Sequence, residues 1–169
     1  MGSKTDSKIL KELYNKYYRE LYLYVYALSS SREIAEDLVQ ETFLKAILSL
    51  SDSHTNMRAW LYMVARNLYF NFAKKEKSKE SLDELNDTPS PSAPVIEKII
   101  ENERRRVCFE ALQSLQGAKK EILILQYFGG LSQKEIAATL HITPENVRVL
   151  SYRAKKELRK FMEENGYEI

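Results

Sequence analysis

The sequence has little of the residues that interrupt helices or cross-link a chain. Its 169 residues include five glycines, four prolines and one cysteine, Cys108. A single cysteine excludes a disulfide framework within the chain and a cysteine zinc cluster. Scarce glycine and proline favour long helices over a sandwich or barrel, which need turn residues at short intervals. Because Cys108 lies in an apolar helical pattern, we expect it in the core.

Signals for catalysis and for membranes are also missing. The two histidines, His54 and His141, have no carboxylate or cysteine at ligand or triad spacing, and no glycine-rich phosphate loop occurs. We therefore expect no enzyme activity, no cofactor and no metal. No apolar run approaches the roughly 20 residues of a membrane span, and no secretory signal opens the chain. We expect no membrane insertion and a cytoplasmic location.

The charge is nearly balanced. Hydrophobic residues make up 44% of the chain and charged residues 30%, which is typical of a soluble helical protein. The net charge is only +2, so any surface that binds nucleic acid must be local. Acidic surface must then lie elsewhere, which leaves room for a protein partner.

The segment from residue 129 to residue 161 has the form of a helix-turn-helix. Ser132 is a good N-cap, and Glu135, three residues later, completes a capping box. His141 and the residue after it form the turn. Thr143 is a second N-cap, and Pro144 suits the first helical position, where its missing N–H is not needed. This arrangement places one helix in the major groove of DNA.

The second helix of this motif has one apolar and one basic face. Residues near its start can reach base edges, and later cations can pair with phosphates. The alternative is a solvated charged face on an ordinary bundle helix. The outward arc holds Glu145, Arg148, Val149, Tyr152, Arg153, Lys156, Arg159 and Lys160.

One interruption divides the helical pattern. Residues 78–94, SKESLDELNDTPSPSAP, hold three of the four prolines and favour extended, solvated chain. We predict a flexible linker at residues 78–95 between two bodies, at residues 6–77 and 96–165. The fold class is all-α: a bundle of three to four helices, then a four-helix domain with the helix-turn-helix. Helices are expected at about residues 7–28, 30–50, 57–76, 96–115 and 118–128, besides the motif.

The first body begins with a helix that is rich in tyrosine. Such a run could form a stacking surface for nucleic acid, but tyrosine commonly packs at the edge of a core, and we expect core or rim packing here. Ser30 and Glu33 predict a capping box at the start of the next helix. That helix has an outward arc that suits a basic partner, the alternative being a solvated face: Asp37, Gln40, Glu41 and Leu44.

The third helix combines cations, amides and aromatic residues away from its apolar stripe. Interleaved cations and rings suit single-stranded nucleic acid, where bases stack on rings and phosphates meet charges. The alternative is an amphipathic helix with snorkelling cations. The side chains concerned are Arg58, Tyr62, Arg66, Asn67, Tyr69, Asn71 and Lys74.

Three motifs in this order resemble a bacterial family. DLVQETFLKA at residues 37–46 is followed by WLYMVARNL at 60–68, the linker, and LSQKEIAATLHITPENVRVLSYRAKKEL at 131–158. Together they resemble the extracytoplasmic-function (ECF) sigma factors of the sigma-70 family, the compact two-domain sigma subunits of RNA polymerase. The resemblance spans residues 8–163. The ordered set is specific, whereas the helix-turn-helix alone also resembles that of response regulators.

The resemblance implies an alternative sigma factor that directs promoter-specific transcription initiation. The first body would bind core RNA polymerase and melt the promoter minus-ten element, and the second would read the minus-35 element. An anti-sigma factor is the further partner that the resemblance implies. The polymerase-binding residues would be Asp37, Gln40, Glu41 and Leu44.

The resemblance also assigns DNA contacts. The loop at about residues 52–57 and the helix after it would capture a flipped base, with Asn67 at the pocket. The minus-ten contacts would be Arg58, Tyr62, Arg66, Asn67, Asn71 and Lys74. The minus-35 contacts would be Thr143, Glu145, Asn146, Arg148, Val149, Tyr152, Arg153 and Lys156.

Two positions depart from the family pattern. Val149 stands where many members have a hydrogen-bonding serine, so we expect an apolar contact there, such as one to a thymine methyl. Asn71 stands where many members have an aspartate, while the phosphate contact of Lys74 is kept. Another reading of the whole chain is a conventional helix-turn-helix regulator without a sigma role, whose first body senses a ligand or dimerises.

Overall fold

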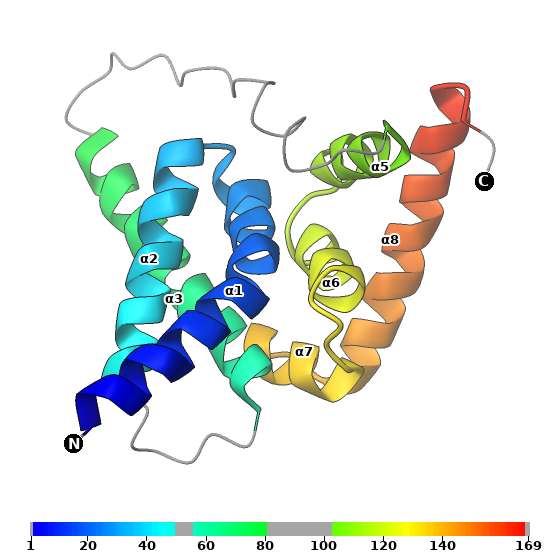
Figure 1. The fold of residues 1–169 in the computed structure, drawn as a ribbon. Coiled ribbons are helices and arrows are strands. Elements are labelled where there is room, and N and C mark those ends of the chain that lie inside the picture. Colours follow the sequence, from blue (N-terminus) through cyan, green and yellow to red (C-terminus); the bar gives the residue numbers. More distant parts are fainter. Residues whose placement is uncertain (1, 50–55, 81–102, 168–169) are drawn as a thin grey trace. The chain divides into compact units, whose positions relative to one another are not determined.

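The described chain is entirely helical outside its turns. The structure, a computed structural model, describes residues 2–49, 56–80 and 103–167 (Figure 1). These residues form seven helices and no strand, which confirms the expected all-α fold. By its contacts the chain divides into two compact units, residues 1–92 and residues 93–169.

The described residues of the first unit form three helices: α1 (Gly2–Ser29), α2 (Arg32–Leu48) and α3 (Met57–Glu80). Each helix packs on the other two (Figure 1). Because both α2 and α3 cover α1, every residue from Leu21 to Ala27 is buried. The largest fully buried side chains of this unit include two tyrosines, Tyr24 and Tyr62.

The tyrosines of α1 line up along the helix. Tyr14, Tyr18, Tyr22 and Tyr26 form a stack in which successive ring centroids lie 4.7, 6.1 and 6.0 Å apart. Tyr17, Tyr22, Tyr24 and Tyr26 are buried, so the expected core packing is confirmed for them. The Tyr22 hydroxyl has no hydrogen-bond partner among the described residues, and burial raises its pKa to about 12.

The start of α2 differs from the predicted capping box by one residue. The Ile34 backbone N–H donates to the hydroxyl of Ser31, at 3.3 Å, so Ser31 is the N-cap. Ser30 instead ends α1: its N–H donates to the carbonyl of Tyr26 at 2.8 Å, and its φ is 53°. A residue that closes one helix in this left-handed conformation does not cap the next, so the prediction for Ser30 and Glu33 was wrong.

The part of the second unit that the structure describes contains four helices: α5 (Glu103–Gln113), α6 (Ala118–Tyr127), α7 (Gln133–Leu140) and α8 (Pro144–Glu164). Helix α8 packs on the other three, and α6 also contacts α5 and α7. The core is mainly aliphatic, and one polar link crosses it, from the Ser151 hydroxyl to the Gln126 side-chain oxygen at 3.0 Å. Its fully buried large side chains are Phe109, Ile122, Leu123, Ile124, Leu125 and Ile136.

Four expectations meet the limits of the described residues or fail. Helix α3 continues to Glu80, so the predicted linker begins about three residues too early, and its remainder lies outside the described residues. Residues 50–55, in the predicted loop before α3, also lie outside the described residues. The same is true of residues 96–102, the start of the predicted fourth helix. Cys108 is exposed, not buried. Helical periodicity places Cys108 among buried neighbours of α5, but it does not tell where along a helix the covering elements end.

Candidate nucleic-acid and protein interfaces

Two caps set the geometry of the helix-turn-helix. The Ser132 hydroxyl accepts from the Glu135 N–H at 3.2 Å, and the Glu135 carboxylate accepts from the Ser132 N–H at 2.9 Å. His141 makes the turn with φ 55°. The Thr143 hydroxyl then accepts from the Asn146 N–H at 3.2 Å and starts α8. The predicted caps and turn are therefore confirmed.

Helix α8 buries one face and exposes the predicted contact residues. Val147, Ser151 and Ala154 are buried against the rest of the unit. Val149 and Tyr152 are 41% and 68% exposed. The structure thus brings all eight predicted minus-35 residues to the surface of α8 or to its N-cap: Thr143, Glu145, Asn146, Arg148, Val149, Tyr152, Arg153 and Lys156.

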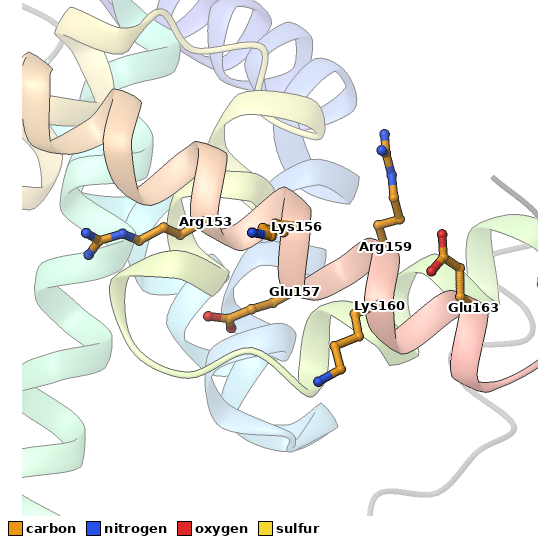
Figure 2. Close-up of a pocket in the computed structure, with 6 residues that line it drawn as sticks. All are labelled: Arg153, Lys156, Glu157, Arg159, Lys160 and Glu163. Atoms are coloured by element: carbon orange, nitrogen blue, oxygen red, sulfur yellow. The ribbon is translucent and has the colours of Figure 1, made fainter.

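Cations continue into the second half of α8, where glutamates lie among them. A hollow of about 520 Å³ is lined there by Arg153, Lys156, Glu157, Arg159, Lys160 and Glu163 (Figure 2). Figure 2 shows Arg159 and Lys160 pointing away from α8 in different directions. Glu157 is paired with Lys119 of α6. A helix of 21 residues is about 30 Å long, so cations in its second half extend beyond base edges and suit phosphates.

Helix α2 exposes an acidic strip that includes leucine. Asp37, Gln40 and Glu41 are exposed, and Leu44 is 59% exposed. Leu48, one turn further along the same arc, is 83% exposed and was missed by the sequence reasoning. Its spacing of four residues from Leu44 was the available signal. Exposed leucines beside carboxylates are typical of a protein-binding surface.

The structure corrects the prediction for Tyr62. Its side chain is fully buried, and its ring packs edge-on against Tyr24 with centroids 5.3 Å apart. Burial raises the pKa of its hydroxyl. Tyr62 lies on the side of α3 that packs in the core of the first unit, so it cannot offer a surface to nucleic acid.

Arg58, in the first turn of α3, is held by α1. Its Nε donates to the Glu20 carboxylate at 3.1 Å, and its guanidinium lies 5.5 Å from the ring centroid of Tyr17. Burial raises the pKa of Glu20, an effect that Arg58 opposes. Arg58 therefore ties the first turn of α3 to α1.

The other predicted minus-ten residues share one face, the α3 arc, defined as Arg66, Asn67, Phe70, Asn71 and Lys74. At about 100° per residue these positions span about 140° of the helix. Asn67, Asn71 and Lys74 are exposed, and Phe70 is 41% exposed. Sequence reasoning missed Phe70, although it lies four residues after Arg66 and three after Asn67.

Two further properties concern the described residues only. No group of three or more histidine, cysteine, aspartate or glutamate side chains in these segments could hold a metal ion. None of the helices described combines the length and the apolar character needed to cross a membrane.

Both units match models of one protein family. Sigma-70 region 2 matches residues 13–79, and Sigma-70 region 4 matches residues 108–158. Among curated relatives, RNA polymerase sigma factor YlaC of Bacillus subtilis is 30% identical over 159 residues, which cover 90% of this chain and 91% of YlaC. The ECF RNA polymerase sigma factor SigM of the same organism is 28% identical over 158 residues, 89% of this chain and 93% of SigM.

Solved structures agree in fold. The sigma factor RpoE, in complex with the anti-sigma factor NepR from Bartonella quintana, aligns with a TM-score of 0.73 and 22% identity. The alignment covers 92% of this chain and 98% of RpoE. CnrH, in complex with the cytosolic domain of CnrY, aligns with a TM-score of 0.66 and 19% identity, covering 95% of this chain and 91% of CnrH.

A three-helix unit followed by a helix-turn-helix unit, each matched to a sigma-70 region, defines the class of protein. The chain belongs to the extracytoplasmic-function sigma factors of the sigma-70 family. It is an alternative sigma factor that directs transcription initiation. The comparisons support this role and not that of a conventional helix-turn-helix regulator.

Proposed function

We propose that this sigma factor binds core RNA polymerase through α2 and contacts two promoter elements through α3 and α8. The observation that carries the proposal is that three exposed helix faces differ in chemistry. The α2 strip is acidic and apolar, the α3 arc holds amides and cations, and the outer face of α8 is basic. The polymerase- and minus-ten-binding domain would comprise residues 6–77, the linker 78–95 and the minus-35-binding domain 96–165.

The α2 strip suits a basic protein surface. Carboxylates at the edge of an interface steer a positively charged partner, and two exposed leucines provide apolar area to bury beside them. Nothing in this strip favours DNA, because its carboxylates repel phosphates. The strip consists of Asp37, Gln40, Glu41, Leu44 and Leu48.

The α3 arc suits the separated strand of the minus-ten element. Asn67 and Asn71 offer amide donors and acceptors to base edges, and Lys74 offers a charge to a phosphate. The basic run that continues to Lys79 extends this surface along the backbone of the strand. Base flipping costs a few kcal/mol of unstacking, which such contacts must offset.

The outer face of α8 suits duplex DNA at the minus-35 element. Arg148 and Asn146, near the start of the helix, are placed to contact base edges, while Lys156 and Arg153 are placed for phosphates. The exposed Val149 offers an apolar contact to a thymine methyl.

This sigma factor would perform no chemistry itself, because RNA synthesis belongs to the polymerase. It would act in the cytoplasm, where the polymerase and the promoter are. Of the two structural relatives, CnrH was solved with the cytosolic domain of CnrY and RpoE with the anti-sigma factor NepR. We extend that partnership to this chain, in which an anti-sigma protein would hold the factor until transcription is needed.

Charge reversal on the α2 strip tests the proposal. Asp37→Arg and Glu41→Arg should weaken binding to core polymerase about 100-fold, because each places a cation against a basic partner. Co-elution with core enzyme and start-site selection in transcription in vitro are the measurements. Glu12→Arg, an exposed position on α1 with the same change in net charge, is the matched control. If both strip variants bind core enzyme normally while keeping the helical circular dichroism signal, the α2 assignment is wrong.

A further inference from the structure

Phe70 is an exposed aromatic ring in a polar setting. Its side chain is 41% exposed, and its neighbours on the α3 arc are two asparagines and two cations, Asn67, Asn71, Arg66 and Lys74. An exposed phenylalanine gains nothing from water, since it has no polar atom, whereas tyrosine at such a position would keep a hydrated hydroxyl. The exposed part of the ring is therefore available to a binding partner.

The ring is supported from within the unit. Tyr69 contacts it edge-on, with centroids 5.2 Å apart and an interplanar angle of 74°. Tyr69 is itself fixed, because its hydroxyl donates to the carbonyl of Leu28 at 2.8 Å. The guanidinium of Arg66 lies 4.5 Å from the Phe70 centroid, within range of a cation–π interaction. Phe70 and Arg66 thus form an adjacent pair at the surface of α3, and the fixed ring of Tyr69 supports this pair.

We propose that Phe70 and Arg66 form a stacking platform for an unpaired base of the promoter strand that α3 binds. The inference rests on the proposed function and adds a residue that the sequence reasoning did not assign. Aromatic rings and arginine planes both stack on nucleobases. The amides of Asn67 and Asn71 and the charge of Lys74 match base edges and phosphate better than they match an apolar protein surface.

The platform also supplies the exposed aromatic ring that the predicted minus-ten site lacks. Tyr62, the ring expected to face nucleic acid, is buried, so Phe70 is the exposed ring of the α3 arc. Stacking tolerates every base, because each base has a π-face. The platform therefore stabilises the open strand and leaves the choice of base to the hydrogen-bonding side chains beside it.

The experiment uses the full chain assembled with core polymerase. The probe is the single-stranded non-template DNA of a promoter that the wild-type holoenzyme transcribes, with 2-aminopurine at successive positions of the minus-ten element. Phe70→Ala should weaken binding of this strand about tenfold and change the 2-aminopurine fluorescence at the position that stacks on the ring. Phe70→Tyr should restore both, and Phe70→Leu should restore neither, because leucine is apolar but has no ring. Ile9→Ala, an exposed apolar position on α1, is the control and should bind normally.

Several results would overturn the platform. The first is wild-type affinity of Phe70→Ala for the single-stranded probe, and the second is full rescue by Phe70→Leu. The third is that Phe70→Ala binds core polymerase less well, while the complex that still forms binds the strand normally. The last result would make Phe70 a protein contact. These outcomes differ from failure of the proposed function, in which the wild-type holoenzyme itself would not bind the strand or select a start site.

Discussion

The two units fill their hydrophobic cores with different kinds of side chain. The first fills its core with tyrosines that carry hydroxyls inward, and it holds Arg58 and Glu20 at its edge. The second uses aliphatic side chains and satisfies the polar groups that begin α7 and α8 with caps. The difference teaches that local caps define where α7 and α8 begin, whereas the side to which a tyrosine ring turns depends on the helices packed against it.

The largest expected effect concerns the ring that sequence reasoning placed on the outside. Tyr62→Ala should lower the free energy of unfolding of the first unit by about 3–5 kcal/mol, the cost of deleting a buried aromatic side chain. Trp60 is the only tryptophan, so its fluorescence during denaturation reports on this unit. Tyr152→Ala, at a side chain that is 68% exposed, should change stability by less than about 0.5 kcal/mol. Unchanged unfolding of Tyr62→Ala would mean that Tyr62 lies outside the core.

On the second unit, two cationic positions of α8 should behave differently. Arg148→Ala should weaken holoenzyme binding to its own minus-35 duplex by about 1–3 kcal/mol and relax the preference for that sequence. Lys156→Ala should weaken binding to all sequences and flatten the salt dependence by about one unit of slope. Titrations of matched and scrambled duplexes at several salt concentrations distinguish the two. Equal loss on both duplexes for Arg148→Ala would remove its assignment to base reading.

A helix cap should matter to the second unit alone. Thr143→Ala removes the hydroxyl that accepts from Asn146 and should cost about 1 kcal/mol of stability. Circular dichroism should show an earlier loss of helix, while the Trp60 transition stays in place. Thr143→Ser keeps the hydroxyl and should restore the wild-type curve. A shift of the Trp60 transition by Thr143→Ala would show that the two units unfold together.

The smallest expected effect is a gain in the stability of the first unit. Tyr22→Phe removes a buried hydroxyl without a partner in the described part of the chain and should stabilise the first unit by up to about 1 kcal/mol. The folded pKa of Tyr22 is about 12 and its ordinary value is 10.0, so the unfolded chain ionises first. Its contribution to stability is therefore present below pH 10.0 and is lost as the pH rises to about 12. Denaturation across this window should show a shallower fall in Tyr22→Phe, and an unchanged slope would contradict the burial of the phenol.

The sequence predicted the all-α class, the helix-turn-helix and the exposed face of α8. These features depend on contacts within about four residues, such as Ser132 with Glu135 and Thr143 with Asn146. The α2 strip was also predicted, apart from Leu48. In each case the information lies within about one helical turn of the sequence.

The face of α3 was predicted less well, because it depends on contacts between distant parts of the chain. Arg58 meets Glu20, 38 residues earlier, and the Tyr69 hydroxyl meets Leu28, 41 residues earlier. Periodicity alone treats an arginine or a tyrosine beside the apolar stripe as exposed. Only the packing of α1 against α3 shows that Tyr62 is inside and Phe70 outside.

The exposed thiol of Cys108 has a practical use. It is the only cysteine, it lies on α5 of the second unit, and Trp60 is the only tryptophan, on α3 of the first. A dye attached to that thiol makes the natural chain a donor–acceptor pair with one fluorophore in each unit. Energy transfer then follows the separation of the units as polymerase, promoter or an inhibitor binds, with no added residue.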